Sequence, residues 1–457
     1  MSWLISQKNN NQQILLIFPR PSGTGTSNDA VFPFPFLGLT QIAATVPPHY
    51  NVQIVDERVS SISGEEKADI VFITTLTSTA SRAYTLADLF KKRGIPVVIG
   101  GIHATVLPEE AAQHATSVVI GEAEGIMDQL LSDFERGELV LEYRSSCLPD
   151  LEDIPHPAID LLNWRHRTFL SSIQTSRGCP HNCNFCSVPT IFGSKLRLKS
   201  LSAVEKELKA LSRLRSRYLF VVDDNFTVTK DRALAIMDLF RYYGYRWMGF
   251  SNLSVSEDEE FLRALRKSGC ISLFVGFESL SGQGLLSKNR SYDSPDSMRR
   301  AIRCIHDHSI GIQGSFIFGF DEDTADVFKE TVSFIQNTGI ELPTICILTP
   351  FPGTPLFNSL EEEGRLMHHK WSLYDMNHVV FKPRNISPEE LQQGYAWALK
   401  YLASPTKILS RLSKRFGSMP YFLVANFSLH RYQTRLAHSL WDSTIQGSMQ
   451  ERGLCSC

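Results

Sequence analysis

The sequence predicts an α/β protein with two successive parallel sheets and a helical C-terminal region. From residue 14 to about residue 140, short apolar runs alternate with amphipathic segments, and the same alternation resumes between residues 169 and 370. Because strands that alternate with helices usually pair in parallel, both stretches favour parallel sheets covered by helices. A third observation sets the last part of the chain apart: residues 392–441 contain neither aspartate nor glutamate.

The first alternating stretch, residues 1–140, predicts a doubly wound, flavodoxin-like sheet. Its strands are short apolar runs, and its helices repeat apolar residues with a period near 3.6. The expected strands are Ile14–Phe18, Val52–Val55, Asp69–Thr74, Pro96–Ile99 and Val118–Ile120, and the expected helices are Leu37–Val46, Arg82–Arg93 and Ile126–Glu135.

Glycine and hydroxyl side chains follow three of these strands. Ligands of open parallel sheets bind outside the carboxyl ends of the strands, where glycine lets a ligand approach the backbone. Any single loop of this kind is more often an ordinary turn, but three together indicate a binding edge. The three loops are Thr75–Thr79, Gly100–Thr105 and Gly121–Gly125.

Residues 141–168 predict a linker, and residues 169–370 predict a second α/β domain. The linker is rich in proline, which stiffens a segment and stops a helix. Six βα units fit an open, partial (β/α)6 barrel rather than a closed barrel of eight strands. The expected strands are Phe169–Thr175, Tyr218–Val222, Trp247–Asn252, Ile271–Gly276, Gln313–Phe318 and Thr344–Leu348, with helices Ala203–Arg213, Arg232–Arg241, Asp258–Lys267, Pro295–His308 and Ala325–Asn337.

The loop after the first strand of this domain carries Cys179, Cys183 and Cys186 in the spacing Cys-x3-Cys-x2-Cys. Three thiols on one turn can hold three irons of an iron–sulfur cube, which leaves the fourth iron open for a ligand. A disulfide would leave one thiol unpaired and would need an oxidising compartment. A structural zinc site would need a fourth ligand such as His181, but no second ligand pair follows at the usual distance.

This loop resembles the cluster loop of the radical SAM superfamily, including the aromatic Phe185 before the third cysteine. The resemblance implies a [4Fe-4S] cluster and S-adenosyl-L-methionine (SAM) as cofactors. It also implies that Asp223 or Asp224 faces the amino group of SAM, while one of the two is expected to cap the next helix. Glu278 is open to a second interpretation as an ordinary ion-pair residue. The further cofactor-binding positions expected at the strand ends are Ser251, Asn252, Gly276, Glu278, Ser279 and Gly319.

The first domain resembles the cobalamin-binding domain that precedes many radical SAM enzymes, and this resemblance implies cobalamin as a third cofactor. The Asp-x-His-x-x-Gly sequence that supplies an axial histidine in other cobalamin proteins is absent. We therefore favour a loop contact or simple packing for His103 over axial ligation of cobalt. The cobalamin-binding positions that the resemblance implies are Thr77, Ser78, Thr79, Gly100, Gly101, His103, Thr105, Gly121 and Glu122.

Composition and charge limit the possible function classes. The 457 residues are 43% hydrophobic and 21% charged, as in ordinary soluble globular proteins. The net charge of −2 gives no indication of nucleic-acid binding. We expect no signal peptide and no membrane-spanning segment, and the scattered cysteines outside the loop fit a reducing cytoplasm.

Residues 371–457 predict a helical lid that selects the substrate. Tyr374–Lys382 is an expected strand, and Ser387 is the expected N-cap of the helix after it. The acid-free stretch predicts either lid helices with solvated cations, which we favour, or a face toward an anionic membrane or an acidic substrate. Its basic residues are Lys400, Lys407, Arg411, Lys414, Arg415, Arg431 and Arg435.

Together, the two resemblances imply a cobalamin-dependent radical SAM methyltransferase. It would act on an unactivated carbon of a small natural-product or lipid-like molecule through a 5′-deoxyadenosyl radical, with a low-potential flavodoxin or ferredoxin as electron donor. A radical cyclase or rearrangement enzyme of the same architecture is one alternative, and a non-catalytic iron–sulfur sensor is another. The methylthiotransferase branch is disfavoured because its N-terminal cysteines are missing here, where the first cysteine is Cys147.

Overall fold

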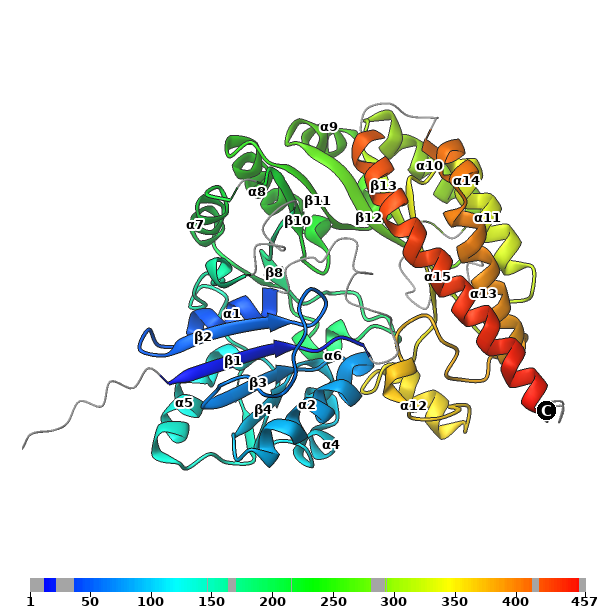
Figure 1. Cartoon of the computed structure of the whole chain (residues 1–457). Coiled ribbons are helices and arrows are strands. Elements are labelled where there is room, and N and C mark those ends of the chain that lie inside the picture. The colour runs from blue at the N-terminus through cyan, green and yellow to red at the C-terminus, as the bar shows by residue number, and fades with distance from the viewer. Residues whose placement is uncertain are drawn as a thin grey trace, which may run out of the picture. The chain divides into compact units, whose positions relative to one another are not determined.

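The chain divides into two compact units, Met1–Arg167 and Thr168–Cys457. The computed structural model, drawn in Figure 1, describes residues 12–21, 37–145, 147–162, 170–214, 216–280, 292, 294–412 and 419–451. Each unit is built around its own six-stranded sheet, so each is described by itself.

The first unit contains a sheet in which every neighbouring pair of strands is parallel, in the order β2-β1-β3-β4-β5-β6. This order confirms the predicted doubly wound sheet. The chain leaves β1 for one side of the sheet and then returns to build the other side, which creates the switch point where such sheets bind ligands. The strands are β1 Gln13–Phe18, β2 Asn51–Asp56, β3 Ile70–Thr74, β4 Val97–Gly100, β5 Ser117–Ile120 and β6 Glu142–Arg144.

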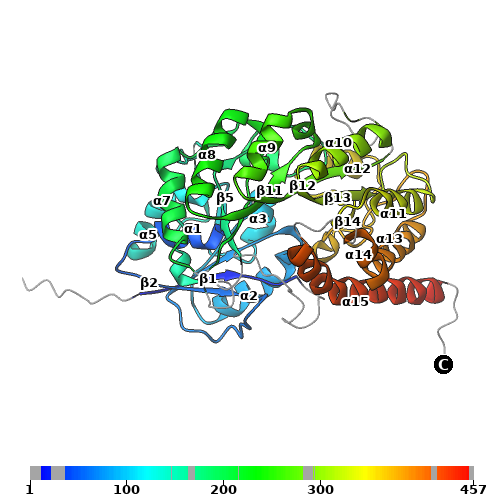
Figure 2. The same ribbon diagram turned by 90° about the horizontal axis from the view of Figure 1, so that it is seen from above.

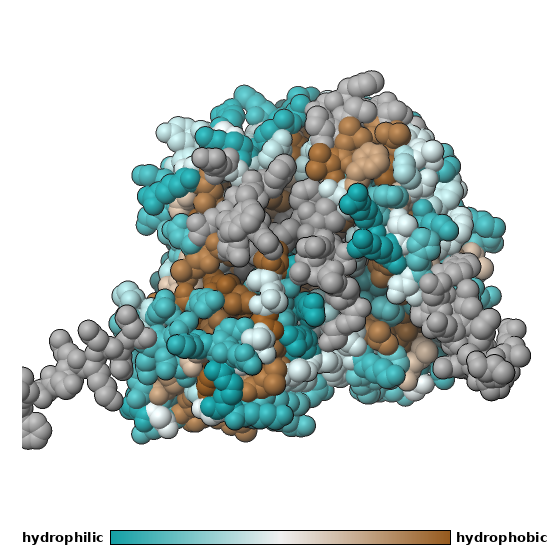
Figure 3. All heavy atoms as spheres, viewed as in Figure 1, coloured by the Kyte–Doolittle hydropathy of each residue, from teal (hydrophilic) through white to brown (hydrophobic). Residues whose placement is uncertain are grey.

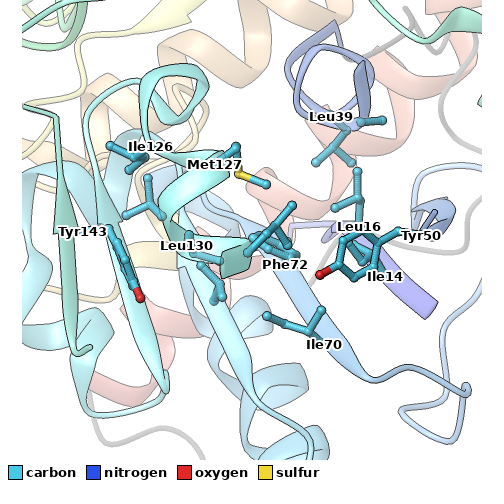
Figure 4. Packing of buried hydrophobic residues seen from close by; sticks show 14 of the residues in the cluster. Ile14, Leu16, Leu39, Tyr50, Ile70, Phe72, Ile126, Met127, Leu130 and Tyr143 are labelled. Atoms are coloured by element: carbon cyan, nitrogen blue, oxygen red, sulfur yellow. The ribbon is translucent and has the colours of Figure 1, made fainter. Parts of the chain in front are cut away.

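Helices cover both faces of this sheet. On one face, Ile14 and Phe72 belong to a buried cluster with Leu39 of α1 and Met127 of α5, as Figure 4 shows. Alternate side chains of a strand point to opposite faces, and on the other face α2 contacts β3 and β4. The helices are α1 Leu37–Thr45, α2 Ala80–Lys92, α3 Ile102–Val106, α4 Pro108–Ala112 and α5 Met127–Arg136.

The second unit contains an open sheet of six parallel strands in the order β14-β13-β12-β11-β10-β7. This arrangement confirms the predicted partial (β/α)6 barrel, because each new strand adds to the same growing edge and β7 and β14 form the two ends. The strands are β7 Ser171–Ile173, β10 Tyr218–Val221, β11 Arg246–Ser251, β12 Cys270–Glu278, β13 Gly311–Phe318 and β14 Leu342–Ile347.

The helices between these strands lie along the outer side of the curved sheet, as Figures 1 and 2 show for α8 and α9. In α9, Phe261, Leu262 and Leu265 are buried, and the side chain of Asp258 caps the helix by accepting a hydrogen bond from the Phe261 amide at 2.9 Å. The amphipathic pattern therefore fixes which helix face meets the sheet. These helices are α7 Leu201–Leu211, α8 Lys230–Tyr242, α9 Glu259–Lys267, α10 Pro295–Asp307 and α11 Val327–Thr338.

The C-terminal part of this unit is helical. Helices α13 (Pro388–Ala403), α14 (Pro405–Leu412) and α15 (Met419–Glu451) pack against one another (Figures 1 and 2). The expected N-cap is confirmed, because the Ser387 hydroxyl accepts a hydrogen bond from the Glu390 amide at 3.2 Å. A β-carbon at Gly311 of β13 would lie 2.4 Å from the Phe422 ring, so α15 packs tightly against the barrel.

Two expectations about this region are wrong. Tyr374–Lys382 is not a strand, because the Asp375 carboxylate accepts hydrogen bonds from the Asn377 and His378 amides at 2.9 and 3.1 Å and folds the segment into a turn. Arg411 is not solvated: it is 1% exposed, and its guanidinium donates to the Leu402 carbonyl and to Asn426 Oδ1 at 2.9 and 3.0 Å. Lys414 and Arg415 lie outside the described residues.

Candidate active site

The cysteine loop follows β7 and begins at β8 (Ser176–Arg177), which pairs antiparallel with β9 (Arg197–Leu198). Gly178 enters the loop with φ +90°, and a β-carbon at this position would lie 2.5 Å from the Lys195 carbonyl oxygen. Both the backbone conformation and the space therefore require glycine, which lets the two ends of the loop close on each other.

Cys179, Cys183 and Cys186 are partly exposed on this loop. The Cys186 amide donates to the Cys183 carbonyl at 3.1 Å, which closes a tight turn between two of the thiols. Burial, followed by the nearby Cys183 and Cys179 thiols, raises the pKa of Cys186 to about 11. Three soft donors gathered on one loop fit a [4Fe-4S] cluster held by three corners.

Asp223 and Asp224 follow β10 and differ in the hydrogen bonds that their carboxylates accept. Asp223 is 1% exposed, and its carboxylate accepts hydrogen bonds from the Thr175 amide and hydroxyl and from the Ser176 hydroxyl, the amide bond being 2.5 Å long. It therefore positions the segment that leads into the cysteines. Asp224 accepts from the Gly178 amide at 3.0 Å, and burial raises the pKa of Asp224 to about 6.

Residues beyond the far edge of the open sheet hold the same loop. The Leu356 amide donates to the Asn184 carbonyl at 3.0 Å, and the Thr190 hydroxyl donates to the Gly353 carbonyl at 3.1 Å. Leu356 lies in α12 (Pro355–Glu362), directly after β14, while Thr190 lies in α6 (Val188–Phe192) of the cysteine loop. The cysteine loop thus bridges the carboxyl ends of the first and last strands.

The end of β13 also contacts this loop. The ring of Phe185 meets the ring of Phe320 edge-on at a centroid distance of 6.1 Å. Asp323 fixes the turn that presents Phe320, because its Oδ2 accepts from the Gly319 and Phe320 amides at 2.8 and 3.0 Å. Asp323 is 2% exposed, and burial raises the pKa of its carboxyl group to about 6.

Sequence reasoning missed Asn184, Thr190 and Asp323. Pro350, Pro352 and Pro355 follow β14 and indicate a rigid turn, but nothing in the local sequence shows that this turn meets the cysteine loop at Asn184 and Thr190. Asp323 follows a strand end by only a few residues, which was the available signal for its capping role.

The remaining predicted positions of the barrel lie at the same strand ends. β12 ends at Glu278, which has φ +62°, and a β-carbon at Gly276 would lie 2.2 Å from Glu278 Oε1. A non-glycine residue held in this conformation indicates a constraint that the surrounding structure imposes. Ser279 is buried beside it. Ser251 exchanges a hydrogen bond of 2.8 Å with Thr227, and Asn252 caps the short helix Leu253–Glu257.

The three loops of the first unit are linked to one another by hydroxyl groups. The Thr75 hydroxyl donates to the Gly100 carbonyl at 2.8 Å, and the Thr105 hydroxyl donates to the Gly101 carbonyl and accepts from the Gly121 amide at 2.8 and 3.0 Å. Thr75 lies in the predicted loop Thr75–Thr79 but was not among the residues expected to bind cobalamin. The three loops therefore form one continuous edge across β3, β4 and β5.

Glycine shapes this edge. Gly101 has φ +97°, and a β-carbon there would lie 2.7 Å from the Thr75 nitrogen and oxygen. Gly121 has φ +87°, but the space where its β-carbon would stand is open. An edge of exposed backbone with room beside it fits the approach of a large, flat ligand such as cobalamin.

Other predicted cobalamin positions are engaged within the protein. Thr79 exchanges hydrogen bonds with the backbone of Leu76, while Thr77 is buried and Ser78 partly exposed. His103 is fully buried, with Nε2 3.3 Å from Glu110 Oε1. Glu122 is also buried, directly after Gly121.

Family models match both units. Residues 173–335 match the Radical SAM superfamily, and residues 29–131 match the B12 binding domain. Residues 354–452, which span the C-terminal helices, match a domain of unknown function, DUF4070.

Relatives of known name align over most of the chain. Bacteriochlorophyllide d C-12(1)-methyltransferase from Chlorobaculum tepidum is 30% identical over 96% of this chain and 97% of that protein. Bacteriochlorophyllide d C-8(2)-methyltransferase from the same organism is 28% identical over 82% of this chain and 89% of that protein. Hopanoid C-2 methylase from Rhodopseudomonas palustris is 27% identical over 78% of this chain and 72% of that protein.

Two solved structures share the fold. The radical SAM methyltransferase TsrM from Kitasatospora setae, with cobalamin and a [4Fe-4S] cluster bound, superposes with a TM-score of 0.65 at 15% identity and covers 95% of this chain and 100% of its own. The cobalamin-dependent radical enzyme OxsB gives a TM-score of 0.67 at 15% identity, over 94% of this chain and 72% of its own. The chain therefore belongs to the cobalamin-binding enzymes of the radical SAM superfamily, which removes the alternative of a non-catalytic sensor.

Proposed function

We propose that the enzyme transfers a methyl group from SAM to an unactivated carbon of an apolar ring compound. The main support is the alignment with a methyltransferase over nearly the full length of both chains. The cysteine loop and the glycine-lined edge supply, in their separate units, the donor atoms and the open backbone that the cofactors need. When bound, the cluster supplies the electron that cleaves SAM, and cobalamin supplies the methyl group.

The inner face of the barrel supports an apolar substrate. Phe220, Phe250 and Phe274 stand on the adjacent strands β10, β11 and β12 and are partly exposed. Their ring centroids are 5.5 Å apart between Phe220 and Phe250 and 4.7 Å apart between Phe250 and Phe274. Trp247, which points to the opposite face, packs instead against Phe240 of α8. A row of three aromatic rings favours contact with another flat apolar group.

The side chains that continue this inner face on β13 and β14 are uncharged, whereas at the end of β12 Glu278 Oε1 lies 2.2 Å from where a β-carbon of Gly276 would stand on the same face. Strand pairing places the side chains of β13 and β14 in register with the aromatic row. An uncharged surface avoids the free energy of desolvating ions when an apolar substrate binds. These residues are Gln313, Ser315, Ile317, Thr344 and Cys346.

Within the active site, we propose that Asp224 faces the amino group of SAM, while Asp223 holds the cysteine loop. Their hydrogen bonds support this assignment. The Asp223 carboxylate already accepts three hydrogen bonds from Thr175 and Ser176. We further propose a reducing cytoplasm and a low-potential flavodoxin or ferredoxin as electron donor. The cysteines outside the cysteine loop are scattered along the sequence rather than spaced as a disulfide framework, which supports the reducing compartment.

The test uses protein reconstituted without oxygen, with cluster, cobalamin and SAM that carries a deuterated methyl group. We offer bacteriochlorophyllide d and a hopanoid as separate substrates and measure products and 5′-deoxyadenosine by mass spectrometry. We expect the labelled methyl group in one of the products. Phe250→Ala should raise the KM for that substrate about tenfold, the loss of roughly 1.4 kcal/mol of contact.

A radical cyclase is the second candidate, because an anaerobic magnesium-protoporphyrin IX monomethyl ester cyclase from Rubrivivax gelatinosus is 23% identical over 74% of this chain. A cyclase would consume SAM and close a ring without transferring the labelled methyl group. Formation of 5′-deoxyadenosine together with an unlabelled, cyclised product would therefore replace our proposal.

A further inference from the structure

One face of α15 is exposed between Val424 and Arg435. Val424, Phe427, Arg431 and Arg435 follow one another at spacings of three and four residues, so they share one face of the helix. Val424 is 49% exposed and Phe427 is 41% exposed, whereas Phe422 on the opposite face is 1% exposed. We call Val424, Phe427, Arg431 and Arg435 the α15 stripe.

The α15 stripe changes from apolar to basic along the helix. In Figure 3 a brown patch lies over the start of α15, and teal atoms follow farther along it. Exposed side chains of this size are commonly found alone, but here two neighbouring apolar residues are continued by two arginines. This order on one face is typical of helices that lie at a membrane surface.

The charge of the surrounding sequence has one sign. Residues 392–441 contain lysine and arginine but no aspartate or glutamate, although the whole chain has a net charge of −2. The described bases of this stretch that are exposed include Lys400 and Arg431. This charge favours an anionic partner, and the exposed apolar residues favour one that also accepts apolar side chains.

Neighbouring helices of the region carry residues suited to a lipid interface. Trp397 of α13 is 37% exposed, and its ring centroid lies 5.5 Å from that of Tyr401. The ammonium group of Lys407 lies 4.6 Å from the Tyr401 ring centroid. Tryptophan, tyrosine and lysine are enriched at the boundary between lipid headgroups and acyl chains.

We propose that the α15 stripe docks the enzyme on an anionic lipid bilayer. Val424 and Phe427 enter the boundary of the acyl chains, and Arg431 and Arg435 meet the headgroup phosphates. Among the described helices, none is long and apolar enough to cross a membrane, so the contact is peripheral. The inference does not rest on the proposed reaction, although apolar ring compounds concentrate in bilayers.

The experiment measures flotation of the full-length holoenzyme with vesicles. One set of vesicles is pure phosphatidylcholine, and the other contains phosphatidylglycerol as well. We expect binding to the anionic vesicles that weakens as salt is raised, and little binding to the neutral ones. Equal binding to both sets, or binding to neither, would overturn the proposal.

Two double variants separate the apolar part of the stripe from the basic part. Val424→Ser with Phe427→Ser should weaken vesicle binding about tenfold or more. Arg431→Ser with Arg435→Ser should weaken it about thirtyfold and remove most of the salt dependence. Matched controls are Tyr242→Ser, an exposed aromatic residue of α8, and Lys206→Ser with Lys209→Ser on α7. The controls should bind as the wild type does.

Further measurements keep the result interpretable. Iron content and substrate-independent 5′-deoxyadenosine formation should be unchanged in the stripe variants, which shows that they are folded and that the reaction is tested separately. Light scattering reports the alternative occupant, a second copy of the chain. The Val424→Ser and Phe427→Ser pair could dissociate a dimer without any effect on vesicle binding. That result would assign the stripe to self-association and contradict the membrane proposal.

Discussion

The two parallel sheets of this chain form their cofactor edges in different ways. In the first unit, threonine hydroxyls join neighbouring loops, Gly101 lets the Thr75 backbone pack close, and Gly121 leaves open space beside the backbone for a ligand. In the second unit, cysteine thiols supply donor atoms, and buried carboxylates hold the loop that carries them. The carboxyl ends of parallel strands can thus admit a large ligand where glycines carry no side chain. They can bind a metal cluster where cysteine side chains supply the donor atoms.

The two edges also differ in how far apart their parts lie in the sequence. The loops of the first edge follow consecutive strands and are tied to their nearest neighbours in the sheet. The cysteine loop is instead tied to the last strand of an open barrel through Asn184 and Thr190. The second edge therefore depends on the closure of the whole domain, whereas the first depends on its local turns.

The largest effect is expected from Cys183→Ala, which removes one thiol from the second edge. The variant should fold but lose nearly all of its iron, because two thiolates cannot retain the cluster, and it should form no 5′-deoxyadenosine. Cobalamin bound by the first unit should be unaffected. Iron analysis measures the cluster content, and absorption spectra measure the bound cobalamin. Cys304→Ala, at a partly exposed cysteine of α10, is the control, and full iron content in Cys183→Ala would contradict our assignment.

The next largest effect is expected from Gly101→Ala, which changes the first edge. The new methyl group would meet the Thr75 backbone at 2.7 Å in a left-handed conformation. We expect a loss of about 3 kcal/mol in unfolding free energy and weakened cobalamin binding, with iron content retained.

The control variant Gly137→Ala separates the cost of the left-handed backbone conformation from the cost of the steric clash with Thr75. Gly137 also has a positive φ, +71°, but its β-carbon position is open. This control should lose only about 1 kcal/mol, the energy of the backbone conformation. Denaturant unfolding measures both variants, and equal losses would show that the close approach to Thr75 does not matter.

A smaller effect is expected from Asp323→Asn, which tests the buried carboxyl groups of the second edge. Burial raises the pKa of Asp323 to about 6 in the folded protein, above its ordinary value. The folded state thus holds this proton more tightly than the unfolded chain, so its stabilising contribution is present at low pH and is lost as the pH rises toward 6.

The asparagine variant lacks this titration. From about pH 5 to about pH 6 the wild type should lose roughly 1 kcal/mol of unfolding free energy relative to Asp323→Asn. Denaturant unfolding at several pH values measures the difference. Parallel stability profiles of the two proteins would mean that Asp323 is not a buried, titrating group.

The smallest effect is expected from Thr190→Val, which removes one hydrogen bond between the cysteine loop and Gly353. The loss of about 0.5–1 kcal/mol should speed release of iron to a chelator about two- to fivefold, because a rate changes exponentially with the free energy that is lost. Thr85→Val removes a similar hydroxyl-to-carbonyl bond within α2 of the first unit and serves as the control. Equal rates of iron release in the two variants would show that the hydrogen bond between Thr190 and Gly353 does not help to retain the cluster.

Local features of this fold were predictable because their causes are local. The alternation of strands and helices, the capping of α13 by Ser387 and the spacing of three cysteines all depend on residues close together in the sequence. Tyr374–Lys382 failed as a strand because Asp375 supplies local hydrogen bonds that the apolar pattern does not reveal.

The sequence by itself determined the two parallel sheets, the thiol loop and the glycine-rich edge, since short-range periodicity and residue chemistry encode them. Only the tertiary structure decided that Asp223 holds the loop, that Asn184 and Thr190 join the two ends of the barrel, and that Arg411 is buried. Those outcomes depend on which segments, distant in sequence, pack together. The burial of a residue and its hydrogen-bond partners are set by this packing and not by its neighbours in sequence.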